Sequence, residues 1–365
     1  MSKKEKFKIS DDFIVWIFLG LALGLLIFSF FAPSIFVDSA KSKDLDFTAT
    51  GSIGDTIGGL MNPFVAISGI LVTFLAFYVQ FSFNKFQIDL FKTEQTNNNL
   101  KYEKDKFENQ FYEMLRLHKE NVNDLTITTK KIIVHSKGNT EIVENTINGR
   151  KVLEYLLNEF ELTLVVAVVS FKEEKLDSKK IINEAYGVFF HGFTSSDITK
   201  HDFFKYLSSL QSAIDNLDYR QFNEKLSEIS GEKTSLAKLI EYPIFKGNSS
   251  QLAHYYRHLY QTVKFIASQD ESKVCYEEKR NYLRILRAQL SNIDQTLLFY
   301  NWYSGFGNQW ENGNNKFLTD YRMIHNLYND LLYLNLDLGK IFNLESGYRK
   351  EKDREKDNLF EFQDW

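Results

Sequence analysis

The chain has 365 residues, of which 44% are hydrophobic and 25% are charged, and its formal net charge is −4. A mean hydropathy of −0.31 excludes a transporter built of many membrane helices, and the slightly acidic balance excludes a strongly basic protein that coats nucleic acid. The single cysteine, Cys275, excludes a disulfide scaffold and a zinc site built from several cysteines.

Two apolar runs near the N-terminus predict two membrane spans, at about 13–31 and 62–83. The first run carries no charge and is followed by Ala32-Pro33, which does not look like a signal-peptide cleavage site, so we expect an uncleaved anchor. The second run opens at Asn62-Pro63, a pattern typical of a helix start. About 20 apolar residues at roughly 1.5 Å each cross a bilayer core.

The charges around these runs predict their orientation. Lysines precede the first run and follow the second, whereas the loop 32–56 has more aspartates than lysines. By the positive-inside rule both chain termini are cytoplasmic and this loop is external. Residues 1–84 are therefore predicted to form a membrane anchor, with the glycine-rich segment 51–59 as a flexible approach to the second span.

Gly20 and Gly24 form a Gly-x-x-x-Gly motif in the middle of the first run. This spacing lets two membrane helices approach closely, so it either pairs the two spans or pairs two copies of the chain. Two tolerated glycines without a packing role are the alternative.

Residues 85–125 are predicted to form a helical stalk that enters a cytoplasmic domain. There is no glycine or proline between Gly69 and Gly138, although Thr96–Asn99 is a candidate break. Apolar side chains recur at helical spacing on one face of the stalk's second half. The members of this face are Phe107, Phe111, Met114, Leu115, His118, Val122 and Leu125.

The segment 126–345 is predicted to be a mainly α-helical domain with one small β-hairpin. The hairpin is indicated by a run rich in β-branched residues from Thr126 to His135, a turn at Ser136–Asn139, and a second strand from Glu141. Helical patterns follow at 150–171, 178–190, 199–216, 219–230, 250–268, 272–300 and 315–342. Residues 346–365 form a charged tail.

The densest polar and aromatic cluster is His254-Tyr-Tyr-Arg-His-Leu-Tyr260. His254 and His258 are four residues apart, as metal-binding histidines on a helix are, but no glutamate follows His254 and Arg257 would repel a cation. We therefore predict no metal, and we interpret the cluster as packing and hydrogen bonding. Arg257 is a candidate anion clamp, and His254 and His258 are candidate ligand- or anion-binding residues beside it.

A second cluster contains Arg280, Arg284 and Arg287, which crowd one helical face. Like charges at this spacing repel unless an anion neutralises them. One interpretation is a site for phosphate or nucleic acid; the other is pairing with carboxylates such as Glu277, Glu278 or Asp294. No hydrolase or metalloprotease motif is present, so a non-enzymatic protein without a cofactor is favoured.

Several segments together resemble a known family. After the two apolar runs come Phe107–His118 and Asn148–Arg150, then His254–Tyr260, Leu286–Ser291 and Leu298–Asn301. In this order they resemble the phage abortive infection family, the AbiC-like group of bacterial antiviral proteins. The resemblance implies a bacterial protein, anchored in the inner membrane, that stops phage propagation at the expense of the host cell. It supplies no catalytic residues.

Our leading hypothesis is a membrane-anchored defence protein whose cytoplasmic domain senses infection and signals to the spans. Its expected partners are the lipid bilayer, a second copy of the chain, and a phage component or nucleic acid. The alternative is a phosphate-binding or nuclease-like effector that uses the arginine face. A third hypothesis is a structural tether for another protein.

Overall fold

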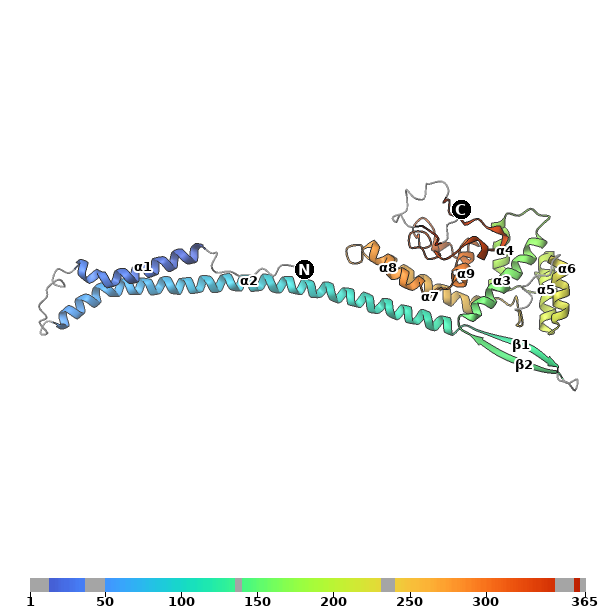
Figure 1. The fold of residues 1–365 in the computed structure, drawn as a ribbon, viewed down its shortest axis with the longest axis horizontal. Coiled ribbons are helices and arrows are strands. Elements are labelled where there is room, and N and C mark those ends of the chain that lie inside the picture. The colour runs from blue at the N-terminus through green and yellow to red at the C-terminus, as the bar shows by residue number, and fades with distance from the viewer. Residues whose placement is uncertain (1–12, 37–49, 135–139, 231–239, 345–357, 362–365) are drawn as a thin grey trace. The chain divides into compact units, whose positions relative to one another are not determined.

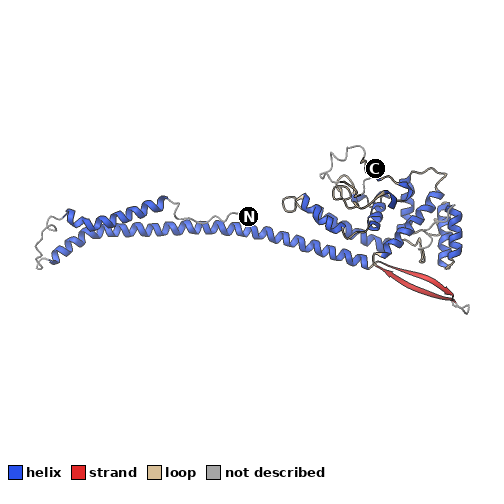
Figure 2. Ribbon diagram, in the orientation of Figure 1, coloured by secondary structure: helices blue, strands red, loops and turns tan. Residues whose placement is uncertain are grey.

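The computed structural model describes residues 13–36, 50–134, 140–230, 240–344 and 358–361 (Figure 1). The described chain is mainly helical, with one antiparallel pair of strands (Figure 2). It divides into two compact units, Met1–Glu103 and Lys104–Trp365. The N-terminal lysines, the loop centred on 37–49, the hairpin turn and most of the charged tail are outside the described residues.

The first unit is a helical hairpin of α1, Phe13–Phe36, and the first part of α2, Thr50–Asn123 (Figure 1). The ring of Phe18 lies 5.2 Å from that of Phe74, and the ring of Phe28 lies 5.0 Å from that of Phe64. Because the two contacts run in opposite order along the two helices, the helices are antiparallel. Most of the other large apolar side chains of both helices are exposed.

The two glycines of the Gly-x-x-x-Gly motif are not among the buried residues of α1. Val15, Ala22 and Ser29 are buried at a spacing of seven, whereas a Cβ added at Gly20 or Gly24 would meet nothing within 4 Å. The Gly-x-x-x-Gly motif therefore does not pair the two helices of one chain in the described structure.

Both prolines predicted to bound the spans lie inside helices. Helix α1 continues past Pro33 to Phe36, and α2 begins at Thr50, well before Pro63. The predicted helix start at Asn62-Pro63 is therefore wrong, and 51–59 is helical rather than a flexible approach. A proline removes only one backbone hydrogen bond, and helices in apolar surroundings tolerate this loss more often than helices in water.

The candidate break at Thr96–Asn99 is also wrong, because α2 is continuous to Asn123. The hydroxyl groups of Thr93 and Thr96 each donate a hydrogen bond to the carbonyl four residues earlier, at 2.9 Å. These bonds satisfy the hydroxyl groups within the helix, so the polar segment has no reason to leave it.

The last turns of α2 belong to the second unit, and their apolar face is as predicted. Phe111 and His118 are buried, as are the neighbouring positions on the same face: Phe107, Val122 and Leu125. The predicted hairpin is confirmed as β1, Thr126–Val134, paired antiparallel with β2, Thr140–Asn148.

Helix α3, Lys151–Ser170, packs against four other helices, α4, α5, α6 and α9, and against β2. Eleven of its side chains are buried, which makes it the central helix of the unit. The other helices of this unit are α4, Ser178–His191; α5, Asp202–Asp215; α6, Tyr219–Ser230; α7, Ser249–Ala267; α8, Tyr276–Arg287; α9, Asn292–Tyr303; and the short α10, Leu338–Ile341.

Two predicted helical stretches differ from the structure. The stretch 272–300 is divided into α8 and α9, because Ser291 and Asp294 form a capping box that starts a new helix. The stretch 315–342 is mostly turns and short 3₁₀ segments. Polar side chains hold its backbone instead: Glu311 accepts hydrogen bonds from the amides of Leu318 and Thr319, which compete with helix formation.

Candidate functional site

The His254–Tyr260 segment lies in the first half of α7, where its residues alternate between core and surface. Tyr255 and Tyr256 are buried, whereas His254 and Arg257 are exposed. Nε2 of His254 lies 3.2 Å from Oδ1 of Asn121 on α2. The described residues contain no group of three or more side chains arranged to hold a metal ion.

A buried polar cluster forms where α2, α7 and α9 meet. The hydroxyl of Tyr255 donates a hydrogen bond to Oδ1 of Asp294, at 2.5 Å. The imidazole of His118 stacks on that of His258, with ring centroids 6.1 Å apart, and lies 5.6 Å from the Tyr255 ring. The backbone amide of Asp294 also donates a hydrogen bond to the hydroxyl of Ser291, the N-cap residue of α9, at 3.2 Å. The cluster therefore connects the end of α2 to two helices that are distant in sequence.

His118 is the least satisfied member of this cluster. It is 1% exposed, and within the described structure neither of its ring nitrogens has a hydrogen-bond partner. Burial lowers its pKa to about 4, and the nearby His258 and Arg150 add to this effect, while Asp294 opposes it. His118 is thus neutral at pH 7 and acts in the packing between α2 and α7.

We expect His118→Leu to raise the free energy of unfolding at pH 7.5 by about 1–2 kcal/mol, because it removes a buried polar ring without partners. In the wild type the unfolded state takes up a proton below about pH 6.5 and the folded state only near pH 4. The free energy of unfolding of the wild type therefore decreases as the pH falls from about 6.5 to about 4. That of His118→Leu should decrease less over the same range.

Urea unfolding of the full chain in detergent, followed by tryptophan fluorescence, measures both effects. His254→Leu is the matched control, since the same substitution at an exposed position should change stability by less than about 0.5 kcal/mol. A destabilised His118→Leu variant would show that the ring makes a favourable polar interaction after all.

The three arginines of the second cluster do not share one open face. Arg280 is buried and donates a hydrogen bond to the carbonyl of Asp320, at 2.7 Å. Arg287 is half-buried and donates to the carbonyl of Arg322, at 2.9 Å. Arg284 is exposed, and its guanidinium lies 3.1 Å from Oδ1 of Asn281. Two of the three thus hold the backbone at 320–322, and anion binding by this face stays a prediction.

Two of the three carboxylates considered as partners of these arginines, Glu278 and Asp294, have other contacts. Glu278 forms an ion pair with Lys104 on α2, at 3.1 Å. Asp294 lies in the buried cluster, 3.7 Å from the guanidinium of Arg150.

Cys275 is an exposed free thiol at the N-cap position of α8.

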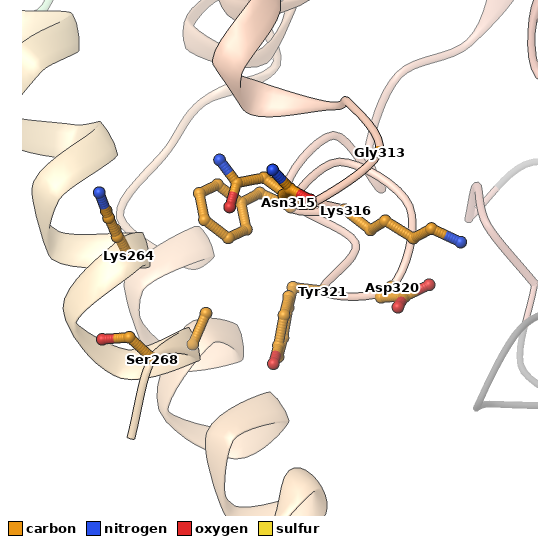
Figure 3. Close-up of a pocket in the computed structure, with 10 residues that line it drawn as sticks. Lys264, Ser268, Gly313, Asn315, Lys316, Asp320 and Tyr321 are labelled. Atoms are coloured by element: carbon orange, nitrogen blue, oxygen red, sulfur yellow. The ribbon is translucent and has the colours of Figure 1, made fainter. Parts of the chain in front are cut away.

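The segment held by the arginines forms one wall of a cavity of about 300 Å³ (Figure 3). The opposite wall is the C-terminal end of α7, with Lys264 and Ser268, and the segment 313–321 contributes the rest of the lining. In Figure 3, Ser268 and Tyr321 lie on opposite sides of the cavity. Its lining residues include two lysines, two asparagines, two aromatic residues, Ser268 and Asp320.

The wall formed by 313–321 is fixed by several hydrogen bonds. The carbonyl of Asp320 accepts a second hydrogen bond from the hydroxyl of Tyr276, at 2.9 Å. The side-chain amide of Asn315 donates to the hydroxyl of Tyr260, at 3.2 Å, and to the carbonyl of Gln309, at 3.0 Å. A cavity with fixed walls and a few polar groups is the usual form of a small-molecule site.

The sequence did not predict this cavity, although it pointed to the arginines behind it. Its walls are separated by α8 and α9, and a helical pattern was expected for the segment that forms the second wall. The run Gly313-Asn314-Asn315, typical of a turn, was the available signal.

Together, these features define a mainly helical protein with a small β-hairpin and two helices that are long and apolar enough to cross a membrane. Residues 247–332 match the model of a family described as "Putative phage abortive infection protein". The match confirms the resemblance found in the sequence, over a segment that contains α7, α8, α9 and the whole lining of the cavity. No curated protein and no solved structure matches the chain.

Proposed function

We propose that this chain is a membrane-anchored phage-defence protein whose C-terminal unit senses infection and signals through α2 to the apolar helices. One observation carries the proposal. The helix that contains the second apolar run also supplies Phe107, Phe111 and His118 to the core of the unit that holds the family match. A change at the matched segment therefore has a covalent helical path toward the membrane.

The exposure of the apolar helices supports membrane anchoring. In the most apolar 18-residue windows of the two helices, only 17% and 6% of the residues are buried. A core helix of a soluble protein would be mostly buried, and contiguous exposed apolar surface is costly in water. Under the positive-inside rule Lys85 and Lys92 place the chain after the second span in the cytoplasm, so both termini are cytoplasmic in this proposal.

The contacts of α2 within the C-terminal unit support the signalling role. The ring of Phe107 stacks on Phe265 of α7 at 5.3 Å and meets Tyr282 of α8 edge-on at 5.1 Å. The hydroxyl of Tyr282 donates to Glu108 at 2.7 Å. Because α2 is packed on both α7 and α8, a displacement of either helix moves α2, and helix shifts of this kind are common in switching proteins.

The proposed effect of the signal is a loss of membrane integrity through association of the spans of several copies. Gly20 and Gly24 are exposed on α1, so a second copy can approach the helix closely at this position. The bacterial inner membrane is the proposed location.

The test is phage infection of bacteria that express the full chain, with a dye that reports membrane potential. We expect protection against phage together with a fall in potential after infection. Gly20→Leu/Gly24→Leu should abolish both while the protein stays in the membrane fraction, and Leu21→Ile, on the same helix, should change neither. Protection with an unchanged potential would contradict the proposed effect.

Replacing the native spans with unrelated ones tests whether they transmit a signal or only hold the protein at the membrane. If two unrelated spans fused before Lys85 restore protection in full, the native spans serve only as a tether. Protection by the chain expressed alone would count against a role as a scaffold for another protein.

A further inference from the structure

Helix α2 has an exposed apolar stripe beyond the predicted second span. It is one uninterrupted helix, Thr50–Asn123 (Figure 1). After residue 83, the side chains of Ile88, Phe91 and Tyr102 are 54%, 66% and 66% exposed. Exposing apolar surface of this size to water is unfavourable, and a helix in water gains most of its stability from packing along such a stripe. This part of α2 therefore needs a packing partner.

The stripe follows a repeat of seven residues. Its positions alternate between steps of three and four residues, and the same spacing continues back into the predicted span at Phe81 and Phe77. A seven-residue repeat of this kind predicts that two α-helices wind around each other with the stripe between them. We call the part beyond the span the α2 seam; its residues are Asn84, Ile88, Phe91, Gln95, Asn98 and Tyr102.

The described part of α1 does not reach the α2 seam, and lipid does not suit it. The two ring contacts between α1 and α2 run in antiparallel order, so the start of α1 at Phe13 lies level with about Val79, before the seam begins. The seam also lies among ionised side chains, which avoid the hydrocarbon core of a bilayer. The charged residues between 85 and 103 are Lys85, Asp89, Lys92, Glu94, Lys101 and Glu103.

The residues that flank the seam suit a second copy of the chain in a parallel, in-register pair. In that pair Gln87 meets Lys92 of the second copy. Glu94 likewise meets Asn99, so like charges do not face each other at these positions. In an antiparallel pair Lys85 and Lys92 of one copy would face the same lysines of the other, and like charges repel.

The polar residues of the seam also favour a second copy as the partner. In a parallel, in-register pair Asn84 and Asn98 each face the same residue of the second copy, and side-chain amides both donate and accept hydrogen bonds. A shift by one repeat would place Asn84 against Phe91 and leave its amide without a partner. Polar residues in such a seam lower stability but fix the register of the pair.

We propose that α2 of one copy pairs with α2 of a second copy, parallel and in register, along the α2 seam. The proposal rests on the proposed membrane anchoring, which gives both copies the same orientation and confines them to one plane. This surface is distinct from the contact proposed at Gly20 and Gly24, which lies on α1. With one surface on each helix, more than two copies can associate.

Disulfide cross-linking in isolated membranes tests the pair, in a Cys275→Ser background that removes the native thiol. Single cysteines replace Ile88 and Tyr102 on the seam, and Thr93 and Leu100 on the opposite side of the helix. Leu100 is the matched control, since it is an apolar side chain that is 61% exposed. A disulfide needs Cα atoms within about 7 Å, so we expect about tenfold more cross-linked dimer from the seam positions.

A pair of charge substitutions tests whether the seam itself holds the copies together. Ile88→Asp/Phe91→Asp, added to the Tyr102→Cys protein, should lower its cross-linking about tenfold, because an unpaired charge is costly to bury. Thr93→Asp/Leu100→Asp introduces the same charge on the opposite side and should leave cross-linking unchanged. Recovery of each variant in the membrane fraction shows that it is still inserted.

Equal cross-linking at positions 88 and 100, or full cross-linking in the presence of Ile88→Asp/Phe91→Asp, overturns the pairing. So does the absence of cross-linked dimer at both seam positions in a chain found in the membrane fraction, and the anchoring then still stands. A chain absent from the membrane fraction contradicts the anchoring and the parallel pair with it. Because no phage is present, the result does not depend on sensing or protection.

Discussion

Glu159→Gln is expected to match the wild type in stability at pH 5 and to exceed it by about 2–3 kcal/mol at pH 8. Glu159 lies in the middle of α3 and is buried. Its Oε1 accepts a hydrogen bond from the amide of Phe245 at 2.7 Å, and its Oε2 lies 3.0 Å from the hydroxyl of Tyr242. The carboxyl group thus fixes the segment that leads into α7.

The geometry around Tyr242 favours the protonated acid. The same hydroxyl lies 2.8 Å from the carbonyl of Tyr155, and one hydroxyl hydrogen cannot serve both acceptors. If Glu159 carries a proton, it donates to Tyr242, which donates to Tyr155, and every group is satisfied. Burial is the largest cause that raises the pKa of Glu159 to about 7, against the hydrogen bonds that favour the ion.

The direction of the pH effect follows from this raised pKa. The unfolded chain loses the proton near pH 4.5, whereas the folded chain keeps it until about pH 7. The stabilisation is therefore complete below pH 4.5 and is lost as the pH rises through 7, by about 3 kcal/mol in all. Glutamine copies the protonated acid, with its amide donating to Tyr242, and has no proton to lose.

Urea unfolding at pH 5 and pH 8 measures the difference, and Glu159→Leu is the control for volume. Leucine leaves the amide of Phe245 buried without its acceptor, so we expect Glu159→Leu to be less stable than Glu159→Gln by about 2–3 kcal/mol at both pH values. A glutamine variant less stable than the wild type at pH 8 would show that the folded protein holds an ionised carboxylate.

The elements in which apolar or β-branched residues recur at a short spacing were predictable from the sequence. The apolar face of the last turns of α2 follows the helical period, and the β-branched run from Thr126 gives the hairpin. Glu159 was missed, although it follows the buried Leu156 by three residues and so falls on the apolar face of a predicted helix. An acidic residue on an apolar helix face was the sequence signal for a buried carboxyl group at this position.

The candidate site could be predicted only in part, because its geometry depends on contacts between distant segments. The sequence brings Arg280 and Arg287 to one side of a helix, but their acceptors are backbone carbonyls of Asp320 and Arg322. Every residue has a backbone carbonyl, so the sequence does not show which carbonyl will accept the hydrogen bond. For the same reason the walls of the cavity, Lys264 on α7 and Lys316 on a loop, could not be paired from the sequence.

Gly247→Ala is expected to cost about 3–5 kcal/mol of folding free energy, because it adds strain and a clash with the backbone. The φ angle of Gly247 is +86°, in the region that favours glycine. A Cβ at this position would lie 2.5 Å from the carbonyl carbon of His191 and 2.7 Å from the amide nitrogen of Gly192. Both are main-chain atoms, so no side-chain rotation relieves the contact.

The position of Gly247 extends this effect to the candidate site. Next to it, the amide of Asn248 donates to the carbonyl of Phe189 at 3.1 Å, and Asn248 is the N-cap residue of α7. Separating the end of α4 from this turn displaces the start of α7, the helix that carries Lys264 to the cavity. We therefore expect Gly247→Ala to lower the melting temperature and to loosen the α7 wall of the cavity.

Gly187→Ala is the matched control, since it lies within α4 and its added Cβ meets only the ring of Phe306 at 4.0 Å. Alanine favours helix over glycine by about 0.8–1 kcal/mol, so this variant should be as stable as the wild type or slightly more stable. Thermal unfolding of the full chain in detergent compares the three proteins. Equal melting temperatures for Gly247→Ala and the wild type would mean that the α4–α7 turn moves apart without cost, and α7 would then not be held from this side.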